Sequence, residues 1–372
     1  MSHEYKFKNC KNMKRRLTVL FALLVCLVGS VQAQLSKTVE LTEAGTLEAQ
    51  LGEDVGKITE LIVKGPLNEA DFVTMKEKMK SIQVLDMGGV TELPFETRWV
   101  DGTNVSFSVI PHSAFEGKLT LQKVVFPPVV EKIYRGTFEE CSNLVEVDFS
   151  LAENLKQIEY RSFSNCSNLK SIDLSKCAKL KYISGFSDCR NLSKVDLSGC
   201  DNLEEIGSSS FYMCVNLNEV VLNGCVSLKR IASQAFYYNR KLSYMDFFSF
   251  PLLEEIGEQA FYDANISGEV VLGENITKIG ERAFAVNRNI TSVDFSNCSK
   301  LVVIDKGIFD GCNVKSVDFT NCLLLNTITP NAFGKSLEEY VIDNGFYKSI
   351  DGVLFNAETN TLLNYPSGKK DE

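Results

Sequence analysis

The sequence contains few of the residues on which most enzyme sites depend. It has two histidines in 372 residues, and His112 is the only one after residue 33, which excludes most catalytic triads and histidine metal sites. The motifs GxSxG, HExxH and GxGxxG do not occur. The segment GEDVGK at 52–57 is one residue short of a phosphate-binding loop and lacks its Ser or Thr. We therefore predict that the protein is not an enzyme and uses no cofactor or metal.

Positive charge is also scarce. The chain has 39 Lys and Arg against 48 Asp and Glu, a net charge of −9. Removal of residues 1–33, which hold six Lys or Arg and one Glu, lowers the net charge to −14. This net negative charge argues against binding nucleic acid through its phosphates, and we expect no nucleic-acid partner.

Residues 1–33 have the features of a signal peptide. Lys14, Arg15 and Arg16 precede an apolar run at 17–28, and Ala33 ends a plausible cleavage site. The run is too short for a comfortable membrane span, although a membrane anchor is the competing interpretation. We expect export, cleavage before Gln34, no membrane span in the mature chain, and a secreted or cell-surface location.

A unit of 23 to 25 residues repeats through most of the chain. Residues 144–166 show its pattern, with large apolar residues at regular positions and a phenylalanine, Phe163, near the end of the unit. The phenylalanines stand at 115, 138, 163, 186, 211, 236, 261, 284, 309 and 333. A fixed period of this length predicts a solenoid in which each coil is stable only when its neighbours cover it. Tyr212, Tyr237 and Tyr262 each follow such a phenylalanine and are expected to stack between coils.

The fold class predicted is an α/β repeat, mainly β, with a parallel sheet on one face and short turns or helices on the other. Residues 34–110 form an N-terminal cap, in which Asn68 caps a helix and Leu67 and Phe72 form a hydrophobic staple between two strands. Residues 111–343 are the repeats. Residues 344–372 are a tail and a C-terminal hairpin, with strands at 347–355 and 361–365 around a turn at 356–360.

An insertion at 88–110 interrupts the cap and contains three aromatic residues, Phe95, Trp99 and Phe107. We expect these aromatics to plug the end of the core, because a terminal unit must cover an exposed face. A binding loop or lid is the alternative.

Several segments resemble the BspA-like class of leucine-rich repeats. They read IPHSAF (110–115), LKSIDLSKCAKLKYI (169–183), LEEIGSSSF (203–211), NITKIGERAF (275–284), LIVKGPLNEADF in the cap, and SIDGVLFN...TLLNYP at the end. The resemblance covers nearly all of 34–365 and implies a leucine-rich-repeat solenoid. It also implies a surface protein that adheres to host matrix proteins, host cells or other bacteria.

Ten of the twelve cysteines follow the leader and occupy only two repeat positions. Equivalent atoms in successive coils lie about 4.8 Å apart, which is long for the β-carbons of a disulfide. The same positions also accept Ala152, Asn239, Ala264 and Ser336. Buried free thiols are therefore favoured, with disulfides as the alternative and metal binding less favoured still.

One residue of each strand is expected to line the exposed face of one continuous parallel sheet. These residues are Val125, Asp148, Asp173, Asp196, Val221, Asp246, Val271, Asp294, Asp318 and Val341. We favour a hydrated row of carboxylates, relieved by the neighbouring serines, over a cation site.

One rung of this face is apolar, and it supplies the candidate partner-binding site: Tyr244, Asp246 and Phe248, flanked by Val221 and Val271. Exposed aromatics in a soluble protein are typical of binding anchors. The alternative, given equal weight, is that Phe248 folds over the edge with Phe250 and Pro251. The leading hypothesis is a non-catalytic protein that binds a protein ligand on a host or bacterial surface. A glycan-binding component and a structural spacer of the envelope are the alternatives.

Overall fold

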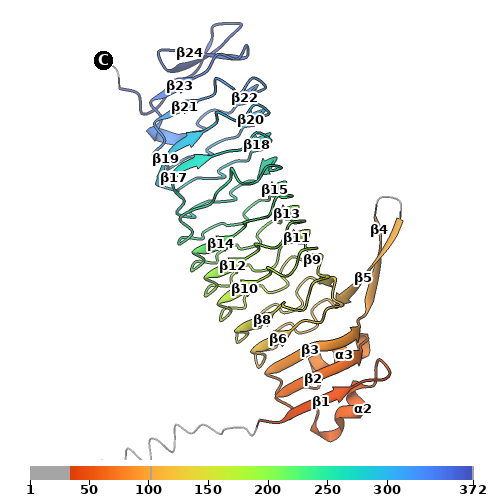
Figure 1. Ribbon diagram of the computed structural model, residues 1–372. Coiled ribbons are helices and arrows are strands. Elements are labelled where there is room, and N and C mark those ends of the chain that lie inside the picture. Colours follow the sequence, from red (N-terminus) through yellow and green to blue (C-terminus); the bar gives the residue numbers. More distant parts are fainter. Residues whose placement is uncertain (1–33, 101–102, 371–372) are drawn as a thin grey trace, which may run out of the picture.

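The computed structural model describes residues 34–100 and 103–370 of the protein. The described chain is a solenoid that rises from an N-terminal cap to a C-terminal cap (Figure 1). One hydrophobic core runs through it from Val39 to Leu354, which agrees with a stack whose coils share their stability. No helix in this described part is long and apolar enough to span a membrane. The expected signal peptide at 1–33 lies outside the described residues.

The N-terminal cap contains the expected strand, helix and strand. It consists of β1 (Ser36–Glu40), α2 (Leu47–Leu51), a 3-10 turn (Gly52–Asp54), β2 (Glu60–Pro66), α3 (Glu69–Glu77) and β3 (Val84–Glu92), with β1, β2 and β3 parallel. The Asn68 side chain accepts a hydrogen bond from the Ala70 N–H at 2.9 Å. The Asp71 carboxylate accepts one from the Asn68 N–H at 2.9 Å. The N-cap prediction is confirmed, and the two side chains satisfy the open end of α3.

Short parallel strands form a first ladder along the solenoid. They are β6 (Lys123–Val125), β8 (Glu146–Asp148), β10 (Ser171–Asp173), β12 (Lys194–Asp196), β14 (Glu219–Val221), β17 (Ser267–Val271), β19 (Asn289–Asp294), β21 (Ser316–Asp318) and β23 (Glu339–Val341). Their hydrogen bonds group them as β1-β2-β3-β6-β8, β10-β12-β14, β17-β19 and β21-β23. The expectation of one continuous sheet is therefore wrong, because the ladder is interrupted between these groups.

A second parallel ladder lies where turns or helices were expected. Its two-residue strands are β7 (Lys132–Ile133), β9 (Gln157–Ile158), β11 (Tyr182–Ile183), β13 (Glu205–Ile206), β15 (Arg230–Ile231), β16 (Glu255–Ile256), β18 (Lys278–Ile279), β20 (Val303–Ile304) and β22 (Thr327–Ile328). Neighbouring strands pair so that the isoleucines lie opposite one another from coil to coil, without interruption.

Turns carry the repeat phenylalanines, which stack inside the solenoid. The rings of Phe163 and Phe186 are 5.0 Å apart and nearly parallel. The expected tyrosine stack is confirmed as well, since the Tyr237 ring lies 5.0 Å from both the Tyr212 and the Tyr262 ring. Stacked rings at this separation are a favourable arrangement in a packed core.

The insertion at 88–110 forms an antiparallel hairpin of β4 (Phe95–Val100) and β5 (Thr103–Ile110), and β5 continues the second ladder by pairing with β7. Phe107 is buried, but Phe95 is 76% and Trp99 is 71% exposed. The expectation that these aromatics plug the core is wrong for Phe95 and Trp99. Phe107 on β5 lies opposite Glu96 of β4, so it is on the other face of the hairpin from Phe95 and Trp99.

The C-terminal cap has three antiparallel strands, β24 (Tyr347–Ile350), β25 (Val353–Asn356) and β26 (Leu362–Asn364). The expected first strand at 347–355 is divided by a tight turn at Asp351 and Gly352, whose φ angles are 48° and 74°. Asp-Gly is a strong signal for a two-residue hairpin turn. The expected hairpin is thus a three-stranded meander.

All ten cysteines of the repeats are buried free thiols. The Cys214 thiol donates to the Phe186 carbonyl at 3.0 Å, and the Cys189 thiol donates to the Phe163 carbonyl at 3.1 Å. Burial raises the pKa of Cys189 to about 12. A buried thiol that keeps its proton reacts poorly, so these positions serve packing.

Candidate binding face

The regular rungs of the first ladder use their outward aspartates to end the strands. In each, the carboxylate accepts the backbone N–H of the residue two positions later. The accepted groups are the N–H of Ser150, Ser175, Ser198, Ser296 and Thr320, at 2.8 to 3.1 Å. The pKa of Asp173 lies below its usual value because the Ser175 side chain and backbone bond to it. The carboxylates are therefore parts of Asx turns. The repeated Asp-x-Ser pattern was a sequence signal for this role.

The row of carboxylates has no metal-binding geometry in the part of the chain that the structure describes. No group of three or more His, Cys, Asp or Glu side chains there is arranged to hold a metal ion. Each aspartate of the row has a turn hydrogen bond instead, which explains why carboxylates recur at this position.

The segment at 243–247 lies between β14 and β17 in the chain and differs from the regular rungs because it forms no strand. We call this segment the detached rung. Within the described residues, β14 pairs with β12 on one side and with no strand on the other. The next coil touches this rung through Ser267, whose N–H and hydroxyl donate to the Ser243 carbonyl at 3.1 and 2.9 Å. Between β14 and residues 243–247, backbone groups are therefore left without the hydrogen bonds of a strand ladder.

The candidate aromatic residues are exposed on this detached rung and directly after it. Tyr244 is 69% and Phe248 is 56% exposed, whereas Phe250 is buried. The alternative in which Phe248 folds over the edge is thus wrong, and Phe250 alone packs inward. Val221 and Val271 are partly buried on the flanking strands.

A shallow hollow of about 90 Å³ opens beside the detached rung. Its lining includes Tyr244, Asp246 and Phe250 from this coil and Val220 and Leu222 from the coil before. Of the five candidate residues, the structure places Tyr244 and Asp246 at the hollow. Phe248 is next to them along the chain, whereas Val221 and Val271 do not line it. Sequence reasoning missed Leu222, because its access depends on the rung being detached.

Asp246 holds the turn that presents Phe248. Its carboxylate accepts the N–H of Phe248 at 3.1 Å, the N–H of Ser249 at 3.3 Å and the hydroxyl of Ser249 at 2.5 Å. Hydrogen bonds to an ionised acceptor are stronger than those between neutral groups. We therefore assign Asp246 the role of positioning Phe248.

Two buried residues of this coil do not fit the repeat. Phe250 occupies the position that Cys225 and Cys298 occupy in other coils, and a larger side chain in a packed site shifts the backbone. Asn239 occupies the position of Cys214. Asn239 is fully buried, and its side-chain N and O have no hydrogen-bond partner in the described chain. Local misfits of this kind concentrate at functional sites in natural proteins.

Asn287 shows what a fitted asparagine at the same repeat position looks like. Its amide donates to the carbonyls of Phe261 and Phe284 at 2.7 and 2.8 Å, and its oxygen accepts the N–H of Ile266 at 2.8 Å. The misfit is therefore a property of the coil that begins at Asn239, and not of asparagine at this position.

Comparison with known proteins identifies the family of the repeats, and the match is interrupted at the coil that contains the detached rung. A family profile described as "BspA type Leucine rich repeat region" matches residues 108–243 and 254–370 in six copies. The interruption at 244–253 contains Tyr244, Asp246 and Phe248. No curated protein matches the chain.

Among solved structures, the chain is similar to a leucine-rich repeat protein from Bacteroides ovatus, with 20% identity, a TM-score of 0.32, and coverage of 69% of this chain and 82% of that one. It is also similar to a leucine-rich cell surface protein from Faecalibacterium prausnitzii, with 17% identity, a TM-score of 0.31, and coverage of 69% and 80%. A third is the functional domain of InlJ from Listeria monocytogenes, which includes a cysteine ladder, with 14% identity, a TM-score of 0.33, and coverage of 76% and 54%.

Proposed function

Because the chain belongs to the BspA-type leucine-rich repeat family, we propose that it is an exported, non-catalytic protein that binds a protein partner at the cell surface. The family supports the cell-surface location, and the apolar leader at 17–28 supports export. The partner in this proposal is a protein of a host or bacterial surface.

The observation that carries the proposal is the detached rung with two exposed aromatic side chains. Tyr and Phe are large, rigid anchors that bury much area at low entropic cost, and anchors of this kind dominate protein interfaces. Beside them, β14 and residues 243–247 offer backbone groups that a partner segment can pair with. The hollow between them receives a side chain of the partner.

Binding to a panel of purified extracellular-matrix proteins tests the proposal. The double variant Tyr244→Ser, Phe248→Ser is compared with the natural protein by biolayer interferometry. We expect at least a tenfold loss of affinity, because loss of a hot-spot side chain costs about 2 kcal/mol or more. The midpoint of urea unfolding stays the same, because both side chains are largely exposed.

Leu323→Ser is the matched control, since Leu323 is a similarly exposed apolar residue, 61% exposed, on a distant coil. It is expected to bind like the natural protein. Equal binding by the double variant and the natural protein would contradict the proposed site.

A further inference from the structure

The β4–β5 hairpin has a second exposed aromatic surface, separate from the detached rung. It projects from the side of the solenoid next to the N-terminal cap (Figure 1). In its antiparallel register Phe95 lies opposite Ser108, Thr97 opposite Ser106, and Trp99 opposite Asn104. Directly opposed residues share a face, and the hydroxyls of Thr97 and Ser106 hydrogen-bond at 2.9 Å. These six residues are the outer face of the hairpin.

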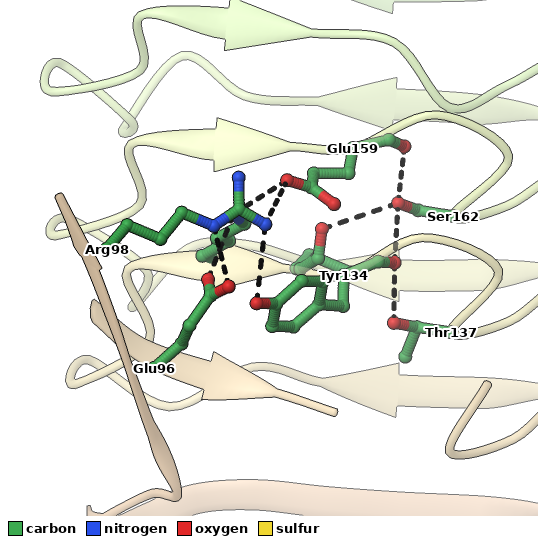
Figure 2. A network of polar contacts seen from close by, with 8 residues as sticks. Glu96, Arg98, Tyr134, Thr137, Glu159 and Ser162 are labelled. Atoms are coloured by element: carbon green, nitrogen blue, oxygen red, sulfur yellow. Dashed lines mark hydrogen bonds and ion pairs between the residues drawn. The ribbon is translucent and has the colours of Figure 1, made fainter. Parts of the chain in front are cut away.

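The opposite face of the hairpin is fixed to the solenoid by a network of charges (Figure 2). Lys132 is fully buried, and its ammonium lies 2.6 Å from the Glu159 carboxylate and 3.3 Å from the Glu96 carboxylate. Arg98 on β4 lies 2.6 Å from Glu96 and 3.5 Å from Glu159. Two cations thus face two carboxylates, which compensates the charge that Lys132 buries.

Aromatic contacts complete this attachment. The Lys132 ammonium lies 4.6 Å from the centre of the Tyr134 ring, and the Arg98 guanidinium lies 5.6 Å from it. Lys132 also lies 5.6 Å from the Phe107 ring. The inner face of the hairpin is therefore held by Lys132 of β7 and by Tyr134 and Glu159, which directly follow β7 and β9. A surface that is held in place before a ligand binds lowers the entropic cost of binding.

The outer face is neutral and amphipathic. None of its six residues carries a charge, although the chain as a whole has a net charge of −9. Phe95 and Trp99 stand four residues apart on one strand, so their α-carbons are about 13 Å apart. Hydroxyl and amide groups lie between and beside the two rings.

Size and charge decide which ligand fits. Six side chains are few compared with the roughly 20–30 residues per side of a stable protein interface. A second copy of this acidic chain would add repulsion. Sugar rings present C–H faces to aromatic rings and hydroxyls to Asn, Ser and Thr, and a linear chain of sugars spans both rings. We infer that the outer face of the hairpin binds a neutral, linear polysaccharide.

Trp99 is the only tryptophan of the protein, so its fluorescence reports on this surface directly. The full-length protein is titrated with laminarin, hydroxyethylcellulose and mannan as neutral polysaccharides, and with hyaluronan as an acidic one. We expect at least one neutral polysaccharide to shift the Trp99 emission to the blue, and hyaluronan to leave it unchanged. No shift with any neutral polysaccharide, or a shift with hyaluronan alone, overturns the inference.

Variants separate this surface from the detached rung. Phe95→Ser is expected to lower the affinity for the polysaccharide by about tenfold or more, as measured by the same emission shift. Trp99→Ser is expected to abolish retardation in a gel that contains the polysaccharide. Tyr244→Ser with Phe248→Ser should leave polysaccharide binding unchanged, and loss of binding in that variant instead overturns the assignment. The inference is also overturned if light scattering shows that the natural protein is a dimer and that Trp99→Ser makes it a monomer.

Discussion

Two successive stretches of the solenoid, 186–236 and 239–250, share one spine but differ in their outer strand. In the first, the Phe186, Phe211 and Phe236 rings stack at 5.7 and 5.3 Å, and β12 and β14 pair on the outside. In the second, the stack continues, with the Phe236 and Phe261 rings 5.1 Å apart, but the outer strand is missing. The inner stack therefore does not depend on the first ladder at this point.

The second ladder explains how the solenoid tolerates the missing strand. Strands β15 and β16 pair across the detached coil, with Ile231 opposite Ile256. The first ladder is thus interrupted at a point where the second ladder is intact. Continuity comes from the isoleucine ladder and the phenylalanine stack, and this leaves the first strand face free to vary.

The largest predicted effect is the loss of the regular coils at alkaline pH. Burial raises the pKa of Cys141, Cys177 and Cys225 to about 12 in the folded protein, whereas an unfolded thiol ionises near 8.5. The unfolded chain therefore releases protons first, and stability falls as pH rises above about 8.5. Each thiol contributes a loss of about 2 kcal/mol between pH 8 and 10.

Burial raises the pKa of the other repeat thiols as well, so their summed loss is of the same order as the roughly 5–15 kcal/mol that typically holds a domain folded. We expect circular dichroism to show unfolding below pH 10. The variant Cys177→Ala, Cys200→Ala, Cys225→Ala is the control, because Ala152 occupies the same repeat position as these three cysteines. It should lose about 6 kcal/mol less than the natural protein over this pH range. An identical pH dependence of the two proteins would show that the thiols do not matter.

The next largest effect compares one phenylalanine of each region. Phe186→Ala removes a fully buried ring stacked between Phe163 and Phe211, and we expect a loss of about 3–5 kcal/mol. Phe248→Ala removes an exposed ring and should change the unfolding free energy by less than about 0.5 kcal/mol. Urea unfolding measures both. Similar losses in the two variants would mean that Phe248 is part of the core.

The spine could be predicted from the sequence because its signal is a strict repeat. Phenylalanines at a period of 23 to 25 residues, with Leu and Ile at fixed offsets, specify which side chains face inward. The second ladder could not be predicted, because two residues around each isoleucine are too few to show the alternation of a strand. The Asp-x-Ser turns were predictable in principle, since that pattern recurs with the strands.

The candidate site was predictable only in part. Exposed aromatics at Tyr244 and Phe248 follow from the period, but the detachment of their rung depends on Phe250 and Asn239 in the interior. The outward direction of Phe95 and Trp99 likewise depends on the charges that hold the other face of the hairpin. Such packing preferences between residues distant in sequence leave no periodic signal.

The smallest predicted effect is the most direct test of the misfit. Asn239→Cys replaces an unpaired buried amide by a thiol, which at this repeat position donates to the carbonyl of the preceding coil, as Cys214 does. We expect a gain of about 1–2 kcal/mol in urea unfolding. Asn287→Cys is the matched control and should lose about 1–3 kcal/mol, because the Asn287 amide is fully paired. Since the two substitutions are the same, opposite signs isolate the unpaired amide as the cause. Equal signs would show that the unpaired Asn239 amide does not destabilise this coil.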